Sequence, residues 1–406
     1  MNQDRFPKAA PCHDAALAAK GLKRIFASKR TADLRPYGRD ARRTLYPVQI
    51  GVENYRALIA KGLFVTHDFA NSFEDITAEP PKGLAPSVPG KLAYVYLDGN
   101  GFSKIRDAAD FAMFAKMCDE ISRAMLIGLL NRFLDGSANP DSKPIWSFGR
   151  DISTRTAPHI WGKDHRQLMR LETLIFGGED ACLVMPAWLA FDVTSLMLKL
   201  AGDAGNAAVA TWGLVDPPKI SFRAGVLICD ARTPARRAVD VAKTLCEDAK
   251  LAYGTSAQSA ISFHISESHD LPEYPGAMLE ALRGPQFGTF ADQATTNTAF
   301  RATMVDWHIQ ESNVIALKKS TFARSQLYAL IQELDGDQGA TKDQSARFDK
   351  FVATYLNRKR DKFSATDLRD KLPCDPGLPL VLRLKVLAEL WDYVDPFKTK
   401  TTEGRI

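Results

Sequence analysis

Two segments of this chain carry carboxylates directly after strand-like apolar runs. Asp98 follows the run 92–97, and the pair Glu179 and Asp180 follows a second run, 171–176. Nucleotidyl transfer needs an activated 3′-hydroxyl and a neutralised pyrophosphate, which two Mg²⁺ ions about 3.5–4 Å apart supply together. Mg²⁺ takes one or two protein carboxylates and completes its shell with phosphate oxygens and water. The three acids therefore indicate a nucleotidyl-transfer site for two Mg²⁺ or Mn²⁺ ions.

Glycines stand beside both groups of acids. Gly99 follows Asp98, and the pair Gly177 and Gly178 precedes Glu179. Glycine tolerates positive φ and leaves no side chain in the way of a triphosphate, so we expect the hairpin glycines to admit the nucleotide. Either segment alone is also typical of a strand-ending turn or an ordinary hairpin. Their joint occurrence, in this order, is what indicates a site.

The elements between residues 89 and 270 must bring these acids together. Apolar patterning predicts, in order, strand 92–98, helix 107–133, strands 171–176 and 181–185, helix 187–200, strand 220–229, helix 234–250 and strand 260–265. This βαββαβαβ order predicts an α+β fold, a ferredoxin-like palm in which the first strand and the following hairpin lie side by side. The three acids would then be neighbours.

Breaks in composition predict three regions. The stretch 79–90 holds four prolines and two glycines and is the best linker candidate, and a second break rich in proline and glycine runs from 271 to 288. We predict an N-terminal mixed region at 1–88, the palm at 89–270 and a mostly helical C-terminal domain at 271–406. A basic cluster at 20–43 could steer nucleotides or RNA, or it could be a solvated surface.

The overall composition is that of a globular protein with a mild basic excess. The 53 basic and 48 acidic side chains leave a net charge of +5, which suits a polyanionic ligand without requiring one. The six cysteines show no zinc-ligand spacing. No apolar stretch fits a signal peptide or a membrane span. We therefore expect a reduced, cytoplasmic protein without a membrane partner.

The two acidic segments also resemble those of a known family. The run Tyr-Val-Tyr-Leu-Asp-Gly-Asn-Gly-Phe at 94–102, followed by Phe-Gly-Gly-Glu-Asp at 176–180, resembles the palm of the polymerase-like large subunit of type III CRISPR complexes. It is also similar to the GGDEF nucleotide cyclases. The segment Ser-Phe-Arg-Ala-Gly at 221–225 and a helix ending Glu-Asp-Ala-Lys at 247–250 fit the same pattern. The similarity covers the palm region.

The resemblance implies roles for individual residues. In that family the first-strand aspartate and the hairpin acids hold the metals, which transfers to Asp98, Glu179 and Asp180. The residue after the first aspartate, here Gly99, often adds its carbonyl oxygen. The lysine at the helix end, here Lys250, would contact the triphosphate. Such enzymes make cyclic nucleotides or short cyclic oligonucleotides as signals, which implies a role in prokaryotic antiviral defence.

Departures from the family pattern bear on the substrate. Asn100 stands where many relatives carry a second acid, so the metal ligands would come mainly from the hairpin acids. Arg106 falls where guanine-specific GGDEF cyclases carry a base-reading asparagine, which favours ATP over GTP. Arg106 itself either reads a base or pairs with a nearby acid. The hairpin carries Glu179 in place of the usual aspartate, and this keeps the charge. Without an evident zinc module or nuclease domain, a minimal or stand-alone relative is expected.

The sequence thus predicts a Mg²⁺-dependent nucleotidyltransferase that converts NTPs into a cyclic mono- or oligonucleotide. Joining two nucleotides across one palm usually requires two facing palms, so we expect a homodimer or a partner palm. The alternative is a non-catalytic palm that binds nucleotide or RNA as a scaffold subunit of a CRISPR-like complex. The sequence leaves the base preference, linkage, ring size and activating signal open.

Overall fold

The chain forms two compact units, Met1–Ala60 and Lys61–Ile406. The computed structural model describes residues 44, 46–70, 72–108, 110–157, 160–177, 179–213, 217–254, 256–267, 271, 278–287, 291–320, 322–335, 341–356 and 364–397. Helix α3 (Val52–Ala60) belongs to the first unit. The basic cluster predicted at 20–43 lies outside the described residues. The domain boundaries predicted near residues 88 and 270 stay predictions.

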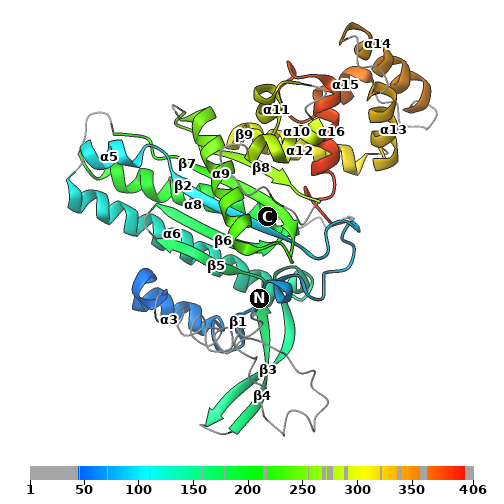
Figure 1. The fold of residues 1–406 in the computed structure, drawn as a ribbon. Helices are drawn as coiled ribbons and strands as arrows, with labels where there is room; N and C mark the ends of the chain where they lie inside the picture. The colour runs from blue at the N-terminus through cyan, green and yellow to red at the C-terminus, as the bar shows by residue number, and fades with distance from the viewer. Residues whose placement is uncertain are drawn as a thin grey trace, which may run out of the picture. The chain divides into compact units, whose positions relative to one another are not determined.

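The second unit contains all the described strands (Figure 1). They are β1 (His67–Phe69), β2 (Lys91–Gly99), β3 (Ser147–Ala157), β4 (Ile160–Met169), β5 (Glu172–Gly177), β6 (Asp180–Pro186), β7 (Phe222–Asp230), β8 (Ala260–Ile265) and β9 (Arg301–Thr303). The helices up to β8 are α4 (Phe73–Thr77), α5 (Phe102–Ala108), α6 (Phe111–Ala138), α7 (Lys143–Trp146), the 3-10 turn η2 (Ala187–Leu189), α8 (Ala190–Ala210) and α9 (Ala235–Tyr253).

The part of the chain after β8 is mostly helical, as the sequence predicts. Its helices are α10 (Met278–Phe287), α11 (Gln293–Ala299), α12 (Met304–Lys319), α13 (Arg324–Asp335), α14 (Thr341–Phe351), the π-helical turn η4 (Val352–Leu356), α15 (Ala365–Asp370) and α16 (Leu380–Leu390). Among the helices that the structure describes, none combines the length and apolarity needed to cross a bilayer. Five cysteines lie in the described ranges, and all five are free thiols.

Six strands form the central sheet in the order β5-β6-β2-β7-β8-β9. Strand β2 pairs antiparallel with both β6 and β7, and β8 pairs parallel with β7. The order β5-β6-β2-β7 is the arrangement that a βαββαβ chain takes in a ferredoxin-like sheet. The predicted α+β palm is therefore confirmed, and β8 and β9 extend it on one side.

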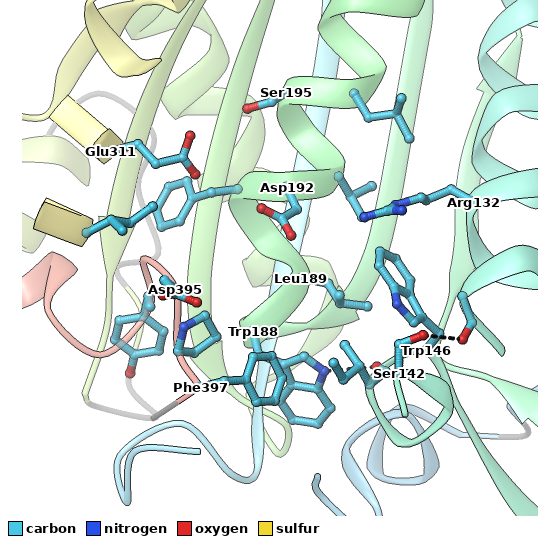
Figure 2. Close-up of a pocket in the computed structure, with 18 of the residues that line it drawn as sticks. Arg132, Ser142, Trp146, Trp188, Leu189, Asp192, Ser195, Glu311, Asp395 and Phe397 are labelled. Carbon is cyan, nitrogen blue, oxygen red and sulfur yellow. Dashed lines mark hydrogen bonds between the residues drawn. The ribbon is translucent and has the colours of Figure 1, made fainter. Parts of the chain in front are cut away.

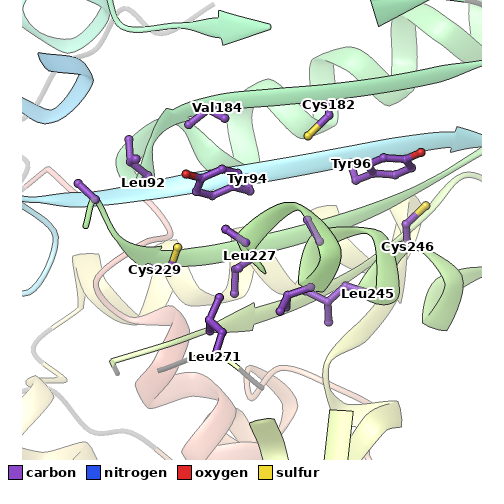
Figure 3. Packing of buried hydrophobic residues seen from close by; sticks show 14 of the residues in the cluster. Leu92, Tyr94, Tyr96, Cys182, Val184, Leu227, Cys229, Leu245, Cys246 and Leu271 are labelled. Atoms are coloured by element: carbon purple, nitrogen blue, oxygen red, sulfur yellow. The ribbon is translucent and has the colours of Figure 1, made fainter. Parts of the chain in front are cut away.

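Helices cover both faces of this sheet, which is why β2 is buried along almost its whole length. Side chains alternate between the faces of a strand. Leu92, Tyr94 and Tyr96 point to the face on which α9 packs, where they join one apolar cluster with Val184 and Leu245 (Figure 3). The alternate positions face α8, which packs against β2 and β7 and also against α6. The end of β2 is thereby held rigidly.

Two segments outside the predicted palm elements have structure that was not expected from the sequence. Residues 147–169 form the β3–β4 hairpin, and β4 pairs with β1 to make a separate three-stranded sheet. No strand was predicted between residues 133 and 171, because this part of the sequence lacks an apolar periodicity. The stretch 79–90, expected to be a linker, packs within the second unit. Val88 is fully buried, and Leu84 forms a β-bridge with Phe397.

Candidate functional site

The neighbouring ends of β2 and β6 bring two of the predicted acids together. The pairing of β2 with β6 runs as far as Leu97 opposite Ala181, so the next position sets Asp98 opposite Asp180. Directly opposite residues of antiparallel strands point to the same face, with Cβ atoms about 4.5–5.5 Å apart. That face is the one on which α9 packs. Segments more than 80 residues apart thus converge as the palm topology predicts.

Tyr96 precedes Asp98 by two residues and therefore lies on the same face. Its hydroxyl donates to Oδ1 of Asp180 at 3.4 Å. Burial, together with the charges of Asp180 and Asp98, raises the pKa of Tyr96, so the hydroxyl keeps its proton and acts as a donor. Tyr96 lies within the run 94–102, but no role was predicted for it from the sequence. The period of two along the strand is the signal that could have found it.

Lys250 lies in the last turn of α9 and reaches the same acids. Its Nζ donates to Oδ2 of Asp98, and the two side chains are only 25% and 16% exposed. Glu247, one turn earlier, lies 3.5 Å from the same ammonium group. Burial acts to lower the pKa of Lys250, but the hydrogen bond and charge of Asp98 and the charge of Glu247 raise it by more. Lys250 is therefore a charged cation within the acidic site.

Gly225 on β7 allows α9 to lie close enough for this contact. A Cβ built on Gly225 would stand 1.9 Å from the carbonyl oxygen of Ala242 and 2.4 Å from the backbone nitrogen of Cys246. Contacts this short do not occur, so any side chain at Gly225 would push the helix away from the sheet. The glycine noted at this position in the sequence thus sets the distance between Lys250 and Asp98.

Arg223 fixes the end of α9, although it pairs in strand register with Asp98. Its guanidinium is fully buried and donates to carbonyl oxygens of the segment 253–258, at 2.8 Å from Gln258 and 3.1 Å from Ser256. Burial lowers the pKa of Arg223 to about 10, which leaves the group charged at neutral pH. No sequence pattern indicated this role, because it depends on where the segment after α9 folds back.

The loop after β2 is tied to the same place. Asn100 donates from Nδ2 to the carbonyl oxygen of Gly254 and to Oγ of Ser221, both at 3.3 Å. Its backbone nitrogen donates to the carbonyl oxygen of Ser221 at 2.9 Å. Asn100 therefore holds the loop beside the end of α9. Gly99 closes β2 beside it, and a Cβ there would stand 2.4 Å from the ring of Phe102.

Glu179 supplies the third carboxylate, at the turn of the hairpin. Its Oε2 is buried and has no hydrogen-bond partner among the described residues. Burial and the charges of Asp98 and Asp180 raise the pKa of Glu179, against a smaller opposite effect of Lys250 and Arg106. Burial also raises the pKa of Asp98, although the hydrogen bond and charge of Lys250 oppose the shift. This crowding of acids is an environment that a divalent cation would stabilise.

The carboxylates do not converge on one point. Among the described residues, no group of three or more His, Cys, Asp or Glu side chains is arranged to hold a metal ion as it stands. The carboxylate of Asp98 instead accepts a hydrogen bond from Nζ of Lys250. Mg²⁺ needs only one or two protein carboxylates beside phosphate oxygens and water. The donor types and the orphaned oxygen of Glu179 therefore fit Mg²⁺, and the metal set stays a prediction.

The remaining predicted site residues are placed less completely. Arg106 lies on α5 and pairs with Asp107 at 3.1 Å, which is the local ion pair left open as an alternative. Its positive charge opposes part of the rise in the pKa of Glu179, so Arg106 belongs to the same electrostatic surroundings. Gly177 ends β5 with a φ of 155°. Gly178 lies outside the described residues.

Comparison with known proteins gives distant structural likenesses only. No protein-family model matches the chain, and no curated protein matches it. A solved Csm1-Csm4 cassette in complex with cA4 aligns with a TM-score of 0.39 at 12% identity, over 80% of this chain and 38% of that chain. Csm1 in T. onnurineus aligns with a TM-score of 0.36 at 14% identity, over 79% of this chain and 38% of that chain.

A third likeness is a Csm1-Csm4 cassette in complex with one ATP, with a TM-score of 0.33 at 12% identity. It covers 78% of this chain and 37% of that chain. The present chain thus spans well under half the length of the solved chains to which it is similar.

Proposed function

We propose that this protein is a Mg²⁺-dependent nucleotidyltransferase that converts NTPs, with ATP favoured, into a cyclic mono- or oligonucleotide and releases pyrophosphate. The observation that carries the proposal is the meeting of Asp98, Asp180 and Lys250 on one face of a palm sheet. Three elements distant in sequence deliver them, and the buried oxygen of Glu179 lies without a partner among the described side chains of the site. This combination suits a polyphosphate held between carboxylate-bound cations and an ammonium group.

Each residue has a defined task in the proposed reaction. Asp98, Glu179, Asp180 and the carbonyl oxygen of Gly99 would hold two Mg²⁺ or Mn²⁺ ions. When bound, these ions would lower the pKa of the attacking hydroxyl and neutralise the leaving pyrophosphate. Lys250 would move its ammonium from Asp98 to the triphosphate.

The chemical step is a substitution at phosphorus. The 3′-hydroxyl oxygen of one nucleotide forms a bond to the α-phosphorus of the same or a second NTP, its proton passes to solvent, and the bond from the α-phosphorus to the pyrophosphate oxygen breaks. Gly177 and Gly178 leave room for the triphosphate. Tyr96 holds Asp180 by donating to Oδ1, and Arg223 and Asn100 keep the end of α9 beside the acids. Arg106 contacts the nucleotide or remains paired with Asp107.

We propose further that the chain is a minimal or stand-alone relative of the polymerase-like large subunit of type III CRISPR complexes. The motifs at 94–102 and 176–180 support this relationship. A cyclic product of two or more nucleotides needs a second palm, supplied by another copy or by a partner subunit. The product would act as a signal in antiviral defence, in the cytoplasm, and RNA would be a further binding partner.

The proposal is tested by incubating the full chain with each of the four NTPs in Mg²⁺ or Mn²⁺. Pyrophosphate release and the mass of the product are measured for the wild type and for Asp98→Ala/Asp180→Ala. We expect release from ATP above the other NTPs and a product whose mass shows a ring, both lost in the variant. ATP binding without any release under all conditions would instead favour the non-catalytic scaffold.

A further inference from the structure

A cavity of about 740 Å³ lies at the other end of β6 from Asp180, and Figure 2 shows the side chains that line it. Strand β6 leads from Asp180 at the acidic site to Pro186, and the helical turns that follow directly line this cavity. The end of α6, the start of α8, one face of α12 and the segment 393–397 complete its walls. The cavity is therefore separate from the nucleotide site and joins the palm to the C-terminal segment.

The floor of the cavity is aromatic and rigid. Trp146, Trp188 and Phe191 line it, and each is no more than 4% exposed. Nε1 of Trp188 donates to the carbonyl oxygen of Ile145 at 3.0 Å, which fixes the indole. Phe191 stacks on Trp307 with ring centroids 4.4 Å apart. A ligand would find a preformed apolar surface here.

Carboxylates from three separate elements stand over this floor. Asp192 comes from α8, Glu311 from α12 and Asp395 from the C-terminal segment, and Figure 2 shows them around the same space. A fourth acid, Asp135, pairs with Lys61 at 3.1 Å and is exposed. The cavity thus has an apolar floor and an acidic wall.

Two basic side chains also line the cavity, fewer than its four acidic side chains. Arg132 stacks its guanidinium over the ring of Trp146, 4.7 Å from the centroid. Nδ1 of His308 lies 3.5 Å from Oε2 of Glu311. Burial and the charge of Asp192 nevertheless raise the pKa of Glu311, against the hydrogen bond and charge of His308. The negative charges of Asp192 and Asp395 beside Glu311 favour a positive charge at this place.

We propose that this cavity binds an organic cation, an ammonium or guanidinium group carried on a short apolar chain. The apolar chain would pack on the rings of Trp188 and Phe191, and the cationic head would pair with Asp192, Glu311 and Asp395. A nucleotide would bring its phosphates against these acids, so the cavity is not a second nucleotide site. Its volume lies within the range of about 300–1,000 Å³ usual for small-molecule sites.

The same cationic chemistry occurs in free amines and in the lysine and arginine side chains of a partner protein. Isothermal titration calorimetry of the full chain, without NTP, separates these sources. The probes are agmatine, putrescine, 1,4-butanediol as the uncharged match for putrescine, and a capped Gly-Arg-Gly peptide. Tighter binding of agmatine than of the peptide points to a free amine, and the reverse order points to a protein side chain.

We expect the cations to bind at one site and 1,4-butanediol not to bind. Asp192→Asn/Glu311→Gln should weaken cation binding by about tenfold or more, since charge-assisted hydrogen bonds are lost. Asp203→Asn, an exposed acid farther along α8 that pairs with Lys199, is the matched control and should bind as the wild type does. Thermal unfolding of each variant checks that it is folded.

Several results would overturn the proposal. These are absence of binding by every cation, equal binding of putrescine and 1,4-butanediol, and equal weakening by the cavity variant and Asp203→Asn. If the cavity variant fails to fold, the comparison of putrescine with 1,4-butanediol on the wild type still decides. Because no NTP is present, the result does not depend on whether the palm is an active nucleotidyltransferase.

Discussion

Lys250 is the residue on which the charge balance of the site depends. Its ammonium contacts Asp98 and lies near Glu247, and the remaining charges at that end of the sheet are mainly negative. A cation placed among carboxylates can pair with them, or it can pair with an arriving polyanion once divalent cations bind the acids. In the proposed reaction the same side chain would therefore pair with Asp98 before the nucleotide arrives and with the triphosphate afterwards.

Replacing Lys250 by Met should weaken ATP binding by about tenfold to a hundredfold, because a charge-assisted hydrogen bond is worth about 1.5–3 kcal/mol. Lys250→Arg should recover part of the affinity. The measurement is the Kd for ATP in Mg²⁺. Lys243→Met, an exposed lysine two turns earlier on α9, is the control and should leave the Kd unchanged. Equal effects of the two methionine variants would contradict a specific role.

The acids of the site could be predicted from sequence because local features mark them. Asp98, Glu179 and Asp180 stand next to glycines at strand ends, and the element order alone makes them neighbours. The supporting residues could not be predicted in this way. Arg223 is the second residue of an apolar strand, and its partners in 253–258 come together only after α9 has packed on the sheet.

At the scale of elements, the position of α9 against the sheet determines the geometry of the site. The strands and helices of the palm were readable because each repeats apolar residues at its own period. The β3–β4 hairpin could not be predicted from the sequence, because two polar strands show no repeat of apolar residues. Helix α9 can lie this close to β7 only because residue 225 is a glycine and carries no Cβ.

Gly225→Ala should lower the free energy of unfolding by about 1–3 kcal/mol, because the new methyl group overlaps the backbone of α9. It should also weaken ATP binding, since Lys250 moves away with the helix. Chemical denaturation and the Kd for ATP measure the two effects. The matched control is Gly202→Ala in α8, where a Cβ would meet only the carbonyl oxygen of Ile220 at 3.9 Å. That change should leave the Kd for ATP near wild type and should not lower the free energy of unfolding, because alanine is favoured over glycine inside a helix. A Gly225→Ala variant as stable as the wild type would refute the packing argument.

At the scale of the whole second unit, a buried ion network joins the palm to the helices that follow it. Asp248 on α9 accepts from Oγ of Ser262 at 2.7 Å and from Nε of Arg301 at 2.9 Å. Arg283, on α10, is fully buried and lies 3.4 Å from the same carboxylate. One side chain thus holds α9, β8, β9 and α10 together.

This network gives stability a defined dependence on pH. Burial acts to raise the pKa of Asp248, but the hydrogen bond from Arg301, the charge of Arg283 and the hydrogen bond from Ser262 lower it by more. Because the pKa in the folded state is below the ordinary value, the stabilisation is complete above about pH 4. It is lost as the pH falls through the folded-state pKa.

Asp248→Asn should therefore lower the free energy of unfolding by about 3 kcal/mol at pH 7, because the buried Arg283 and the partly buried Arg301 lose their counter-charge. The difference from wild type should shrink as the pH falls below about 4. Denaturation curves across this pH range measure it. Asp240→Asn, an exposed acid on the same helix, should change stability little at any pH. A constant difference between Asp248→Asn and wild type at all pH values would argue against the ion network.

The most direct test of the carboxylate site is the rate of pyrophosphate release from ATP, measured for the wild type, Asp98→Ala/Asp180→Ala and Asp203→Asn. We predict release that requires Mg²⁺ or Mn²⁺, that falls by about a hundredfold or more in the double variant, since both residues would bind the ions directly, and that is unchanged in Asp203→Asn. Equal release from the wild type and the double variant, or no release from a wild type that binds ATP and the metal, would contradict the proposed function.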